Sequence, residues 1–362
     1  MTALRQLPLH QRHVGLGARF TEFAGWQMPL WYEGAVAEHG AVRRTAGVFD
    51  VSHMGRTWVM GNGAGGALAS ALSRDPGRLG AGESQYALAC NERGGVVDDL
   101  LVYRLAAERF LVIGNAANAG RVRDLLAAAC LGRDAEAEDA GEDSVLLAVQ
   151  GPAARERLAA VLGQTVLGIA RRACSEHVTG GATYFLSRTG YTGEDGFEVR
   201  TAVEAGGALL DRLLAGGVAP CGLAARDSLR LEAALPLHGA DIDESTTPWE
   251  AGLGWAVELD HEFAGRAAVA AARESVDRRL ACLVSDGEGV LRAGYPVRHR
   301  NEPVGSITSG GFSPMLHTSI AMAYLPRGLT AEGTVLSVVA RGKEVPCRVV
   351  KRPFYRPPGV GG

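Results

Sequence analysis

Long uninterrupted hydrophobic runs are missing from this sequence. No stretch of about 18 apolar residues occurs, which is the length that a membrane-spanning helix needs. The first ten residues, M-T-A-L-R-Q-L-P-L-H, hold no apolar core of the kind found in signal peptides. The sequence therefore predicts no membrane span and no secretory leader, and we expect a cytoplasmic protein.

Cysteine is scarce, and its pattern excludes further classes. The six cysteines lie singly in apolar stretches, and no two have the spacing of a metal site or a redox pair. The nine histidines are dispersed as well, without metal-ligand spacing. We therefore expect no metal, and buried thiols in a reducing compartment.

An excess of charge of one sign is also absent. The chain has 37 Lys and Arg against 40 Asp and Glu, a net charge of −3, so nucleic acid is not expected as a partner. Hydrophobic residues make up 47% and charged residues 21%, which is an ordinary globular balance. A length of 362 residues predicts two or three domains with a large buried core.

Strand-like and helix-like segments are mixed without regular alternation, which predicts an α+β fold with mixed and antiparallel sheets. A turn at 91–95 joins two apolar runs and predicts an antiparallel hairpin. Residues 134–143 carry six carboxylates and are interpreted as a solvated connection between lobes. Strands are expected at 56–60, 85–90, 96–103, 109–115, 145–149 and 183–187, and helices at 116–130 and 224–234.

After about residue 276 the pattern becomes almost entirely strand, which predicts a C-terminal β-rich, barrel-like module at 277–362. The strands expected there are 280–284, 304–309, 320–324, 334–339 and 345–350. We divide residues 1–276 into two intertwined lobes, about 1–55 with 140–245 and about 56–139 with 246–276.

The segment Gly61-Asn62-Gly63-Ala64-Gly65-Gly66 matches the dinucleotide pattern G-x-G-x-x-G. A dinucleotide site also needs a parallel βαβ crossover and an acidic residue at the end of the second strand. Here the following strands form a tight antiparallel hairpin instead. We therefore interpret the glycines as a strand-to-helix turn and expect no dinucleotide cofactor.

Two adjacent carboxylates, Asp98 and Asp99, lie in the apolar run 96–103. A buried carboxylate is costly without partners, so each needs an explanation. Successive strand residues point to opposite faces, which separates the two side chains. Asp98 is interpreted as capping the Gly94–Gly95 turn. Asp99 shares a face with Tyr103 and is the candidate functional group.

Two further segments carry candidate site residues. The glycine-rich loop 188–198 allows the backbone to approach a ligand closely, and Glu198 is the acid placed to point inward as a strand resumes. The alternative is an elaborate turn with solvated acids. In the predicted helix, Arg226 and Arg230 share a face, either as solvated ion pairs or as buried arginines that line a site.

The segment 49–55 offers Asp50, Ser52 and His53 within four residues. Such neighbours do not form a catalytic triad, whose nucleophile and base must meet across space. His53 is therefore interpreted as a hydrogen-bonded structural residue.

Eight motifs in order give the chain a family resemblance. It resembles the aminomethyltransferase, or T-protein, of the glycine cleavage system, from about residue 7 to 356. The motifs are F-A-G-W-Q-M-P at 23–29, F-D-V-S-H-M-G at 49–55, D-D-L-L-V-Y at 98–103, Q-G-P at 150–152, R-T-G-Y-T-G-E-D-G-F-E at 188–198, A-R-D-S-L-R-L-E-A at 225–233, T-T-P-W-E-A-G-L-G-W at 246–255 and P-F-Y-R at 353–356.

The resemblance implies a folate enzyme. Such enzymes take an aminomethyl group from the lipoyl arm of the H-protein, release ammonia and form 5,10-methylenetetrahydrofolate from tetrahydrofolate. It also implies helices and sheets around a central folate channel. Asp99 matches the family's catalytic acid beside the pterin. The family's pterin-site positions match Tyr86, Tyr103, Asn115, Tyr191, Glu198 and Arg226.

Two other functions within the superfamily stay open at this point. A non-catalytic folate-binding relative acts in iron–sulfur protein maturation, but its K-G-C-Y-x-G-Q-E motif is absent here. A demethylase of dimethylglycine-type or sulfonium-type donors is usually fused to a flavin domain, for which 362 residues leave no room.

The sequence departs from the family pattern at four positions. Ala224 replaces Gly, Gly311 replaces Thr, and Met315 and His317 replace small or polar residues, so the resemblance does not extend to these positions. Residues 341–356 hold six basic residues against one acid. This segment is either a solvated edge or a patch that attracts folate glutamates or an acidic carrier.

Overall fold

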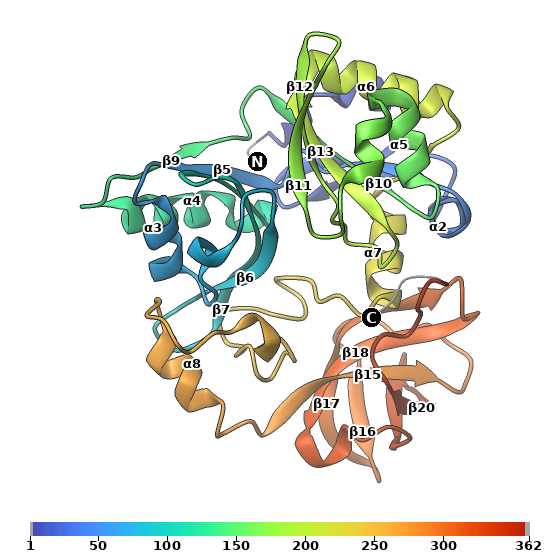
Figure 1. The fold of residues 1–362 in the computed structure, drawn as a ribbon. Helices are drawn as coiled ribbons and strands as arrows, with labels where there is room; N and C mark the ends of the chain where they lie inside the picture. Colours follow the sequence, from blue (N-terminus) through green and yellow to red (C-terminus); the bar gives the residue numbers. More distant parts are fainter. Residues whose placement is uncertain (1–2, 359–362) are drawn as a thin grey trace.

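The computed structural model describes residues 3–358 and contains three large β structures with helices against two of them (Figure 1). One is a five-stranded sheet, one is a six-stranded sheet, and the third is a closed barrel formed by the C-terminal part of the chain. The predicted α+β class and the C-terminal barrel are confirmed.

The five-stranded sheet carries the two aspartates and is antiparallel throughout, with the order β6-β7-β8-β5-β9. Its apolar residues pack against helices α3 and α4 through Leu68 and Leu126. The predicted hairpin at 91–95 joins β6 to β7. The elements are β5 (Gly55–Met60), α3 (Ala64–Ala71), β6 (Ser84–Cys90), β7 (Val96–Ala106), β8 (Arg109–Gly114), α4 (Ala119–Cys130) and β9 (Glu136–Asp139).

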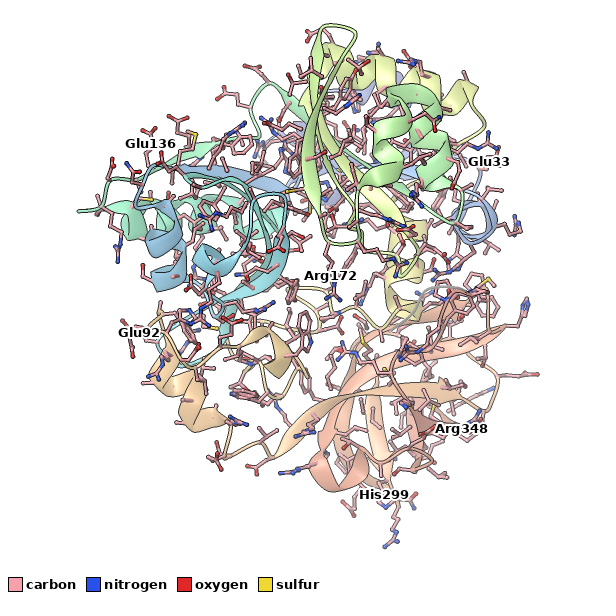
Figure 2. All side chains as sticks on the ribbon, viewed as in Figure 1. Glu33, Glu92, Glu136, Arg172, His299 and Arg348 are labelled. Atoms are coloured by element: carbon pink, nitrogen blue, oxygen red, sulfur yellow. The ribbon has the colours of Figure 1, made fainter. Side chains whose placement is uncertain are left out.

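The acidic segment corrects one interpretation. Residues 136–139 are strand β9 rather than a plain solvated connection, because their backbone pairs with β5 at the edge of the sheet. The carboxylates still reach water, since Glu136, Glu138 and Asp139 are exposed, and Figure 2 shows Glu136 at this outer edge. Backbone pairing therefore outweighs the low strand propensity of acidic residues.

The glycine segment 61–66 serves packing between backbones. Gly61 has φ +110°, and a Cβ there would lie 2.4 Å from the carbonyl oxygen of Asp134. The amide of Gly63 donates to the same oxygen at 2.7 Å. Because the sheet is antiparallel, the βαβ crossover of a dinucleotide site is not formed here. That the protein uses no dinucleotide stays a prediction.

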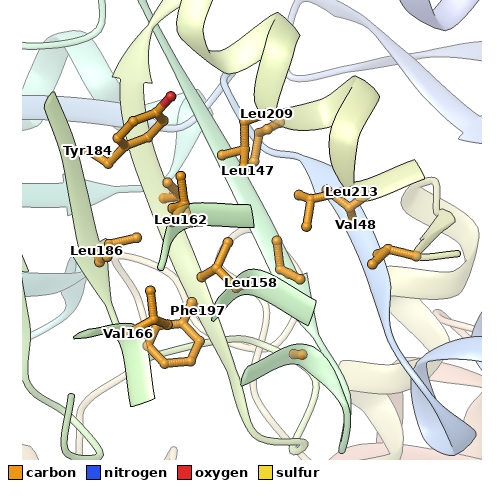
Figure 3. Close-up of a cluster of buried hydrophobic side chains, with 14 of the residues drawn as sticks. Val48, Leu147, Leu158, Leu162, Val166, Tyr184, Leu186, Phe197, Leu209 and Leu213 are labelled. Atoms are coloured by element: carbon orange, nitrogen blue, oxygen red, sulfur yellow. The ribbon is translucent and has the colours of Figure 1, made fainter. Parts of the chain in front are cut away.

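The six-stranded sheet, of order β11-β12-β13-β10-β4-β14, packs against α5 and α6. Figure 3 shows Leu158 and Leu162 of α5 and Leu209 and Leu213 of α6 meeting side chains of the sheet, among them Phe197. The elements are β4 (Gly47–Asp50), β10 (Ser144–Gln150), α5 (Ala154–Leu162), β11 (Cys174–Thr179), β12 (Ala182–Ser187), β13 (Gly196–Ala202), α6 (Val203–Ala215) and β14 (Ala219–Pro220).

A small N-terminal sheet of order β1-β3-β2 was not anticipated from the sequence. Helix α7 lies between the six-stranded sheet and the barrel, and it contacts both β3 and β17 (Figure 1). The elements are β1 (Arg5–Gln6), α1 (His10–Gly15), β2 (Arg19–Phe23), β3 (Trp26–Trp31), α2 (Ala35–Arg44) and α7 (Leu223–Glu232).

The barrel closes in the order β15-β18-β17-β16-β19-β20 around an apolar interior. All five predicted strands are present, and β16 was missed. The elements are β15 (Arg278–Ser285), β16 (Pro296–His299), β17 (Glu302–Ser313), β18 (Thr318–Pro326), β19 (Val335–Ala340) and β20 (Lys343–Val350), preceded by α8 (Arg266–Ala272). We retain the division into two lobes and a barrel as a proposal about folding units.

The six cysteines are all buried and free, as predicted. Within residues 3–358, no helix is long and apolar enough to cross a membrane.

Candidate active site

Asp99 lies half-buried on β7 beside two other predicted site residues. The hydroxyl of Tyr86, on the neighbouring strand β6, donates to Asp99 Oδ2 at 3.0 Å. The side-chain amide of Asn115, just past the end of β8, donates to Asp99 Oδ1 at 2.8 Å. Antiparallel pairing brings these three residues, 13 and 16 positions apart, into one cluster.

Asp98 does not cap the Gly94–Gly95 turn, which corrects the sequence interpretation. The side chain of Asn91 accepts from the amides of Arg93 and Gly95 instead. Asp98 is fully buried and accepts three hydrogen bonds. The donors are the backbone N–H of Asn115 at 3.0 Å, Asn115 Nδ2 at 2.8 Å and Asn118 Nδ2 at 2.7 Å. It therefore satisfies the donors at the end of β8.

The two carboxylates face different sides of the sheet but share one donor. Asp98 pairs in register with Ala89 and Asp99 with Leu88, so their side chains alternate as predicted. Strand β8 ends at Gly114, and beyond this end Asn115 Nδ2 reaches both carboxylates at 2.8 Å. Asp98 and Asp99 are thus joined through a single side-chain amide.

Burial disfavours ionisation of both carboxylates. Burial and the charge of Asp99 raise the pKa of Asp98 to about 6, although the amides of Asn118 and Asn115 act in the opposite direction. Burial also raises the pKa of Asp99, against the hydrogen bonds from Tyr86 and Asn115. Raised carboxyl pKa values in a partly open position are typical of groups that handle protons or stabilise charge.

Glu198 points inward from β13, as predicted, and is only 6% exposed. Its Oε2 accepts from Thr189 Oγ1 at 2.6 Å and from the hydroxyl of Tyr103 at 3.3 Å. No donor within residues 3–358 reaches Oε1, which leaves one carboxylate oxygen for a ligand. Tyr103 is fully buried, so the structure places it behind Glu198 as a support rather than on a ligand-facing surface.

Arg226 on α7 faces the same region without a partner of its own. Its Nη1 is buried, and no described group bonds to it. Its guanidinium lies 4.8 Å from the ring centre of Tyr191, whose hydroxyl donates to the carbonyl of Pro236 at 2.5 Å. Burial lowers the pKa of Arg226, with the charge of Glu198 opposing this effect. Arg230, four residues on, is instead paired with Asp227 and Asp241.

Two glycines of loop 188–198 pack against Gln150, and approach of the loop backbone to a ligand stays a prediction. A Cβ at Gly190 or at Gly196 would lie within 2.6 Å of the side chain of Gln150. Gln150 donates to the carbonyl of Thr189 at 3.1 Å and accepts from Thr192 Oγ1 at 2.9 Å. The small residues therefore make room for Gln150, which fixes the loop and, through Thr189, the carboxylate of Glu198.

Three residues at this site were not identified from the sequence. Trp255 is 61% exposed and stacks on Tyr86 with ring centres 5.2 Å apart. Asn118 and His238 extend the hydrogen-bond chain from Asp98. The repeated asparagine in N-A-A-N at 115–118 was the available signal, because the second asparagine comes one helical turn after the first.

Two cavities flank these residues. A small one of about 10 Å³ is lined by Arg226, Asp50, Phe49 and Cys221 among others. A larger one of about 390 Å³ lies where the barrel meets residues 240–246, and its lining includes Asp241, Asp243 and Arg278 but none of the predicted site residues. The site itself is thus defined by its free polar atoms, not by the larger cavity.

His53 is buried beside this region, and the predicted hydrogen bond is not formed. Its Nδ1 has no described partner, and its ring packs edge-on against Phe23 at 5.8 Å. Burial and the charge of Arg226 lower the pKa of His53 to about 3, so it is neutral.

Comparison with known proteins identifies the family to which the chain belongs. The GCVT N-terminal domain model matches residues 9–261, and the glycine cleavage T-protein C-terminal barrel domain model matches residues 278–356. The chain belongs to the glycine cleavage T-protein family. The resemblance seen in the motifs is thereby confirmed.

Full-length relatives give the activity. An aminomethyltransferase of Synechococcus sp. (strain RCC307) is 44% identical over 97% of this chain and 99% of its own, and that of Rubrobacter xylanophilus is 45% identical over 98% and 95%. The crystal structure of glycine cleavage system aminomethyltransferase T from Bartonella henselae aligns with a TM-score of 0.93 and 38% identity over 98% of this chain and 99% of its own. This T-protein family member is an aminomethyltransferase.

Proposed function

We propose that the enzyme transfers a one-carbon unit from an aminomethyl group on the lipoyl arm of the H-protein to tetrahydrofolate, with release of ammonia. The observation that carries this proposal is the pair of unused polar groups, Arg226 Nη1 and Glu198 Oε1, beside the Asp99 cluster. A buried guanidinium nitrogen without a partner is costly, so a ligand that supplies an acceptor to Arg226 Nη1 is favoured there.

The unused groups fit the pterin ring of tetrahydrofolate. A pterin presents an amino group and a ring N–H side by side, which require acceptors, and a carbonyl oxygen, which requires a donor. Oε1 of Glu198, with its two lone pairs, supplies the acceptor and Arg226 supplies a donor. When bound, the folate supplies the two nitrogen atoms that accept a carbon at the oxidation level of formaldehyde. The residues that we propose to hold it are Tyr86, Tyr103, Asn115, Tyr191, Glu198 and Arg226, with Tyr103 acting through Glu198.

Asp99 is the residue that we propose to act on the reacting atoms. Its charge lies in a half-buried position, where electrostatic interactions are stronger than in water. Asn115 and Tyr86 fix both of its oxygens, so the carboxylate needs little reorganisation. A raised pKa allows Asp99 to hold a proton at one oxygen during the departure of ammonia.

The decisive experiment is folate-dependent ammonia release from an aminomethylated lipoyl carrier. We expect rapid release with tetrahydrofolate and little without it. Folate binding without release would favour the non-catalytic maturation function. Release of a methyl group from dimethylglycine would favour the demethylase. That the H-protein is the carrier, that no metal takes part and that the enzyme is cytoplasmic stay predictions.

A further inference from the structure

Asn118 and His238 lie behind the aspartates. Asn118 stands at the start of α4, and its Nδ2 donates to Asp98 Oδ1 at 2.7 Å and lies 3.1 Å from Nδ1 of His238. His238 follows α7 in the chain, 120 residues from Asn118. The chain of contacts runs from His238 through Asn118, Asp98 and Asn115 to Asp99.

The hydrogen bonds in this chain have a definite direction. His238 Nε2 lies 3.2 Å from the carbonyl oxygen of Val96, which only accepts, so Nε2 carries the proton. Because the Asn118 N–H₂ group can only donate, Nδ1 of His238 accepts from it. Both hydrogens of Asn118 Nδ2 are used, one toward His238 and one toward Asp98. The Asp98 carboxylate and His238 Nδ1 therefore both require the nitrogen end of the Asn118 amide, and His238 adds to the preference that Asp98 sets.

We propose that Asn118 is a positioning residue for the transfer reaction, orienting Asp99 through Asp98 and Asn115, and that His238 fixes the amide of Asn118 in its donating orientation. This inference rests on the proposed role of Asp99. Without the Asn118 donor, Asp98 keeps only Asn115 as a partner and pulls that side chain away from its shared position between the two carboxylates.

The charged and titratable groups around Asp98 and Asp99 determine how this series of hydrogen bonds responds to pH. Asp99 is the neighbour of Asp98 on the same strand and its charge acts on Asp98, and His238 acts on Asp99 from the loop after α7. Tyr86 and Tyr191 lie on the Asp99 side. Since the Asn118 donor favours the ionised form of Asp98, its loss makes Asp98 protonate at higher pH.

The test compares Asn118→Leu, His238→Leu and His238→Asn with the unaltered enzyme. Asn62→Leu is the matched control, because Asn62 also donates to an aspartate, Asp134 at 2.7 Å, but on the exposed surface. Folate-dependent ammonia release gives kcat and KM between about pH 5 and about pH 8, and calorimetric titration with tetrahydrofolate gives its affinity over the same range.

We expect Asn118→Leu to lower kcat on the order of 10- to 100-fold, because small displacements of a catalytic group have effects of this size. The KM of this variant changes little. The fall of kcat at low pH, and the change of tetrahydrofolate affinity at low pH, both begin at a higher pH than in the unaltered enzyme. His238→Leu has the same effects in weaker form. His238→Asn places an acceptor near the position of Nδ1 and restores most of the activity, and Asn62→Leu changes nothing.

Unchanged kcat and unmoved acidic limbs in a folded Asn118→Leu variant would overturn the proposal. If that variant does not fold, the two His238 variants decide, since equal activity of the Leu and Asn forms contradicts the role of His238. Absence of folate-dependent ammonia release from the unaltered enzyme would instead contradict the proposed function. The two failures are therefore distinguishable.

Discussion

The two adjacent aspartates have unequal surroundings, and this makes them separable by mutation. Asp99→Asn keeps the shape of the side chain but removes the negative charge at the reacting atoms. We expect turnover to fall on the order of 10²- to 10⁴-fold with little change in melting temperature. Ammonia release and thermal unfolding of the same sample check this.

Asp98→Asn is expected to act mainly on stability. An amide in that buried position must turn its own N–H₂ group either toward the backbone N–H of Asn115 or toward the side-chain donors of Asn115 and Asn118. The cost is about 1–3 kcal/mol in free energy of unfolding, with a smaller loss of turnover than in Asp99→Asn. Full turnover of Asp99→Asn beside an inactive, stable Asp98→Asn would require reassignment of the catalytic carboxylate.

Arg226 tests the folate orientation independently of the chemistry. Arg226→Gln removes the charge and shortens the donor, so we expect weaker tetrahydrofolate binding, by about 1.5–3 kcal/mol for a lost charged hydrogen bond. Because the unpaired Nη1 is buried, the unliganded variant is expected to be as stable as the unaltered enzyme or more so. Calorimetric titration and unfolding curves measure the two effects, and unchanged folate affinity would contradict the orientation. Arg12→Gln, at an exposed ion pair, is the control.

At the scale of elements, the strands that sequence reasoning identified are the ones with continuous β-branched or aliphatic runs. Strand β16 was missed because Pro296 opens it and only Val297 is apolar and buried. Strand β9 was missed because its carboxylates favour solvent, whereas backbone pairing at a sheet edge decides its structure. Local preference could not predict either one, since both depend on a partner strand distant in the chain.

The same limit applies to the candidate site. Asp99 was identified because a carboxylate in an apolar strand is costly to bury without partners. Glu198 was identified because it follows Phe197 at the start of a strand. The contact between Asn118 and His238 spans 120 residues, and no spacing in the sequence encodes it. Trp255 likewise reaches Tyr86 only through the fold.

The aspartate cluster depends on Gly114, the last residue of strand β8. A Cβ there would lie 2.5 Å from Leu100 Cδ2 and 2.7 Å from Asp98 Oδ2. Gly114→Ala must therefore displace Asp98, at a cost of about 1–3 kcal/mol, and we expect turnover to fall with stability. Gly120→Ala is the control, since nothing lies within 4 Å of that Cβ and alanine favours the helix. Unaltered stability and activity of Gly114→Ala would show that the end of β8 adapts freely.

At the scale of the whole molecule, the C-terminal segment joins the barrel to the site. The backbone amide of Tyr355 donates to the carbonyl of Glu232 at the end of α7, and Arg352 donates to the carbonyls of Ala234 and Ala251. Arg348 is paired with Asp286, and Figure 2 shows it on the barrel. Part of the basic segment is therefore structural, and Lys343 and Lys351 remain exposed without ion pairs among the described residues.

Those two lysines are the groups to test for electrostatic attraction. If they attract the folate glutamates, the affinity for a triglutamate form of tetrahydrofolate should fall as salt rises, and more steeply than the affinity for the monoglutamate. Lys343→Glu with Lys351→Glu should abolish that difference while leaving the monoglutamate affinity unchanged. Equal salt dependence of both folates in the unaltered enzyme would restrict the segment to a structural role.

His53 makes one contribution to the response of folding to acid. Its pKa of about 3 in the folded protein lies below the 6.5 of a free side chain, because burial and Arg226 disfavour the charged ring. The unfolded chain therefore binds the proton first as the pH falls. Stability from the neutral ring is complete above about pH 6.5 and is lost progressively as pH falls from there toward 3.

His53→Leu removes this titrating side chain from its buried position. We expect its melting temperature to fall less than that of the unaltered enzyme between about pH 7 and about pH 5, because protonation of the unfolded chain no longer competes at this side chain. His317→Leu is the control, since His317 is exposed on the surface rather than buried. Glu232, whose pKa is lowered to about 2 by His39, Ser313 and Arg43 despite its burial, affects stability mainly below pH 4.5 and is unchanged in all three proteins. Melting curves of His53→Leu that run parallel to those of the unaltered enzyme would mean that His53 takes up its proton equally easily in both states.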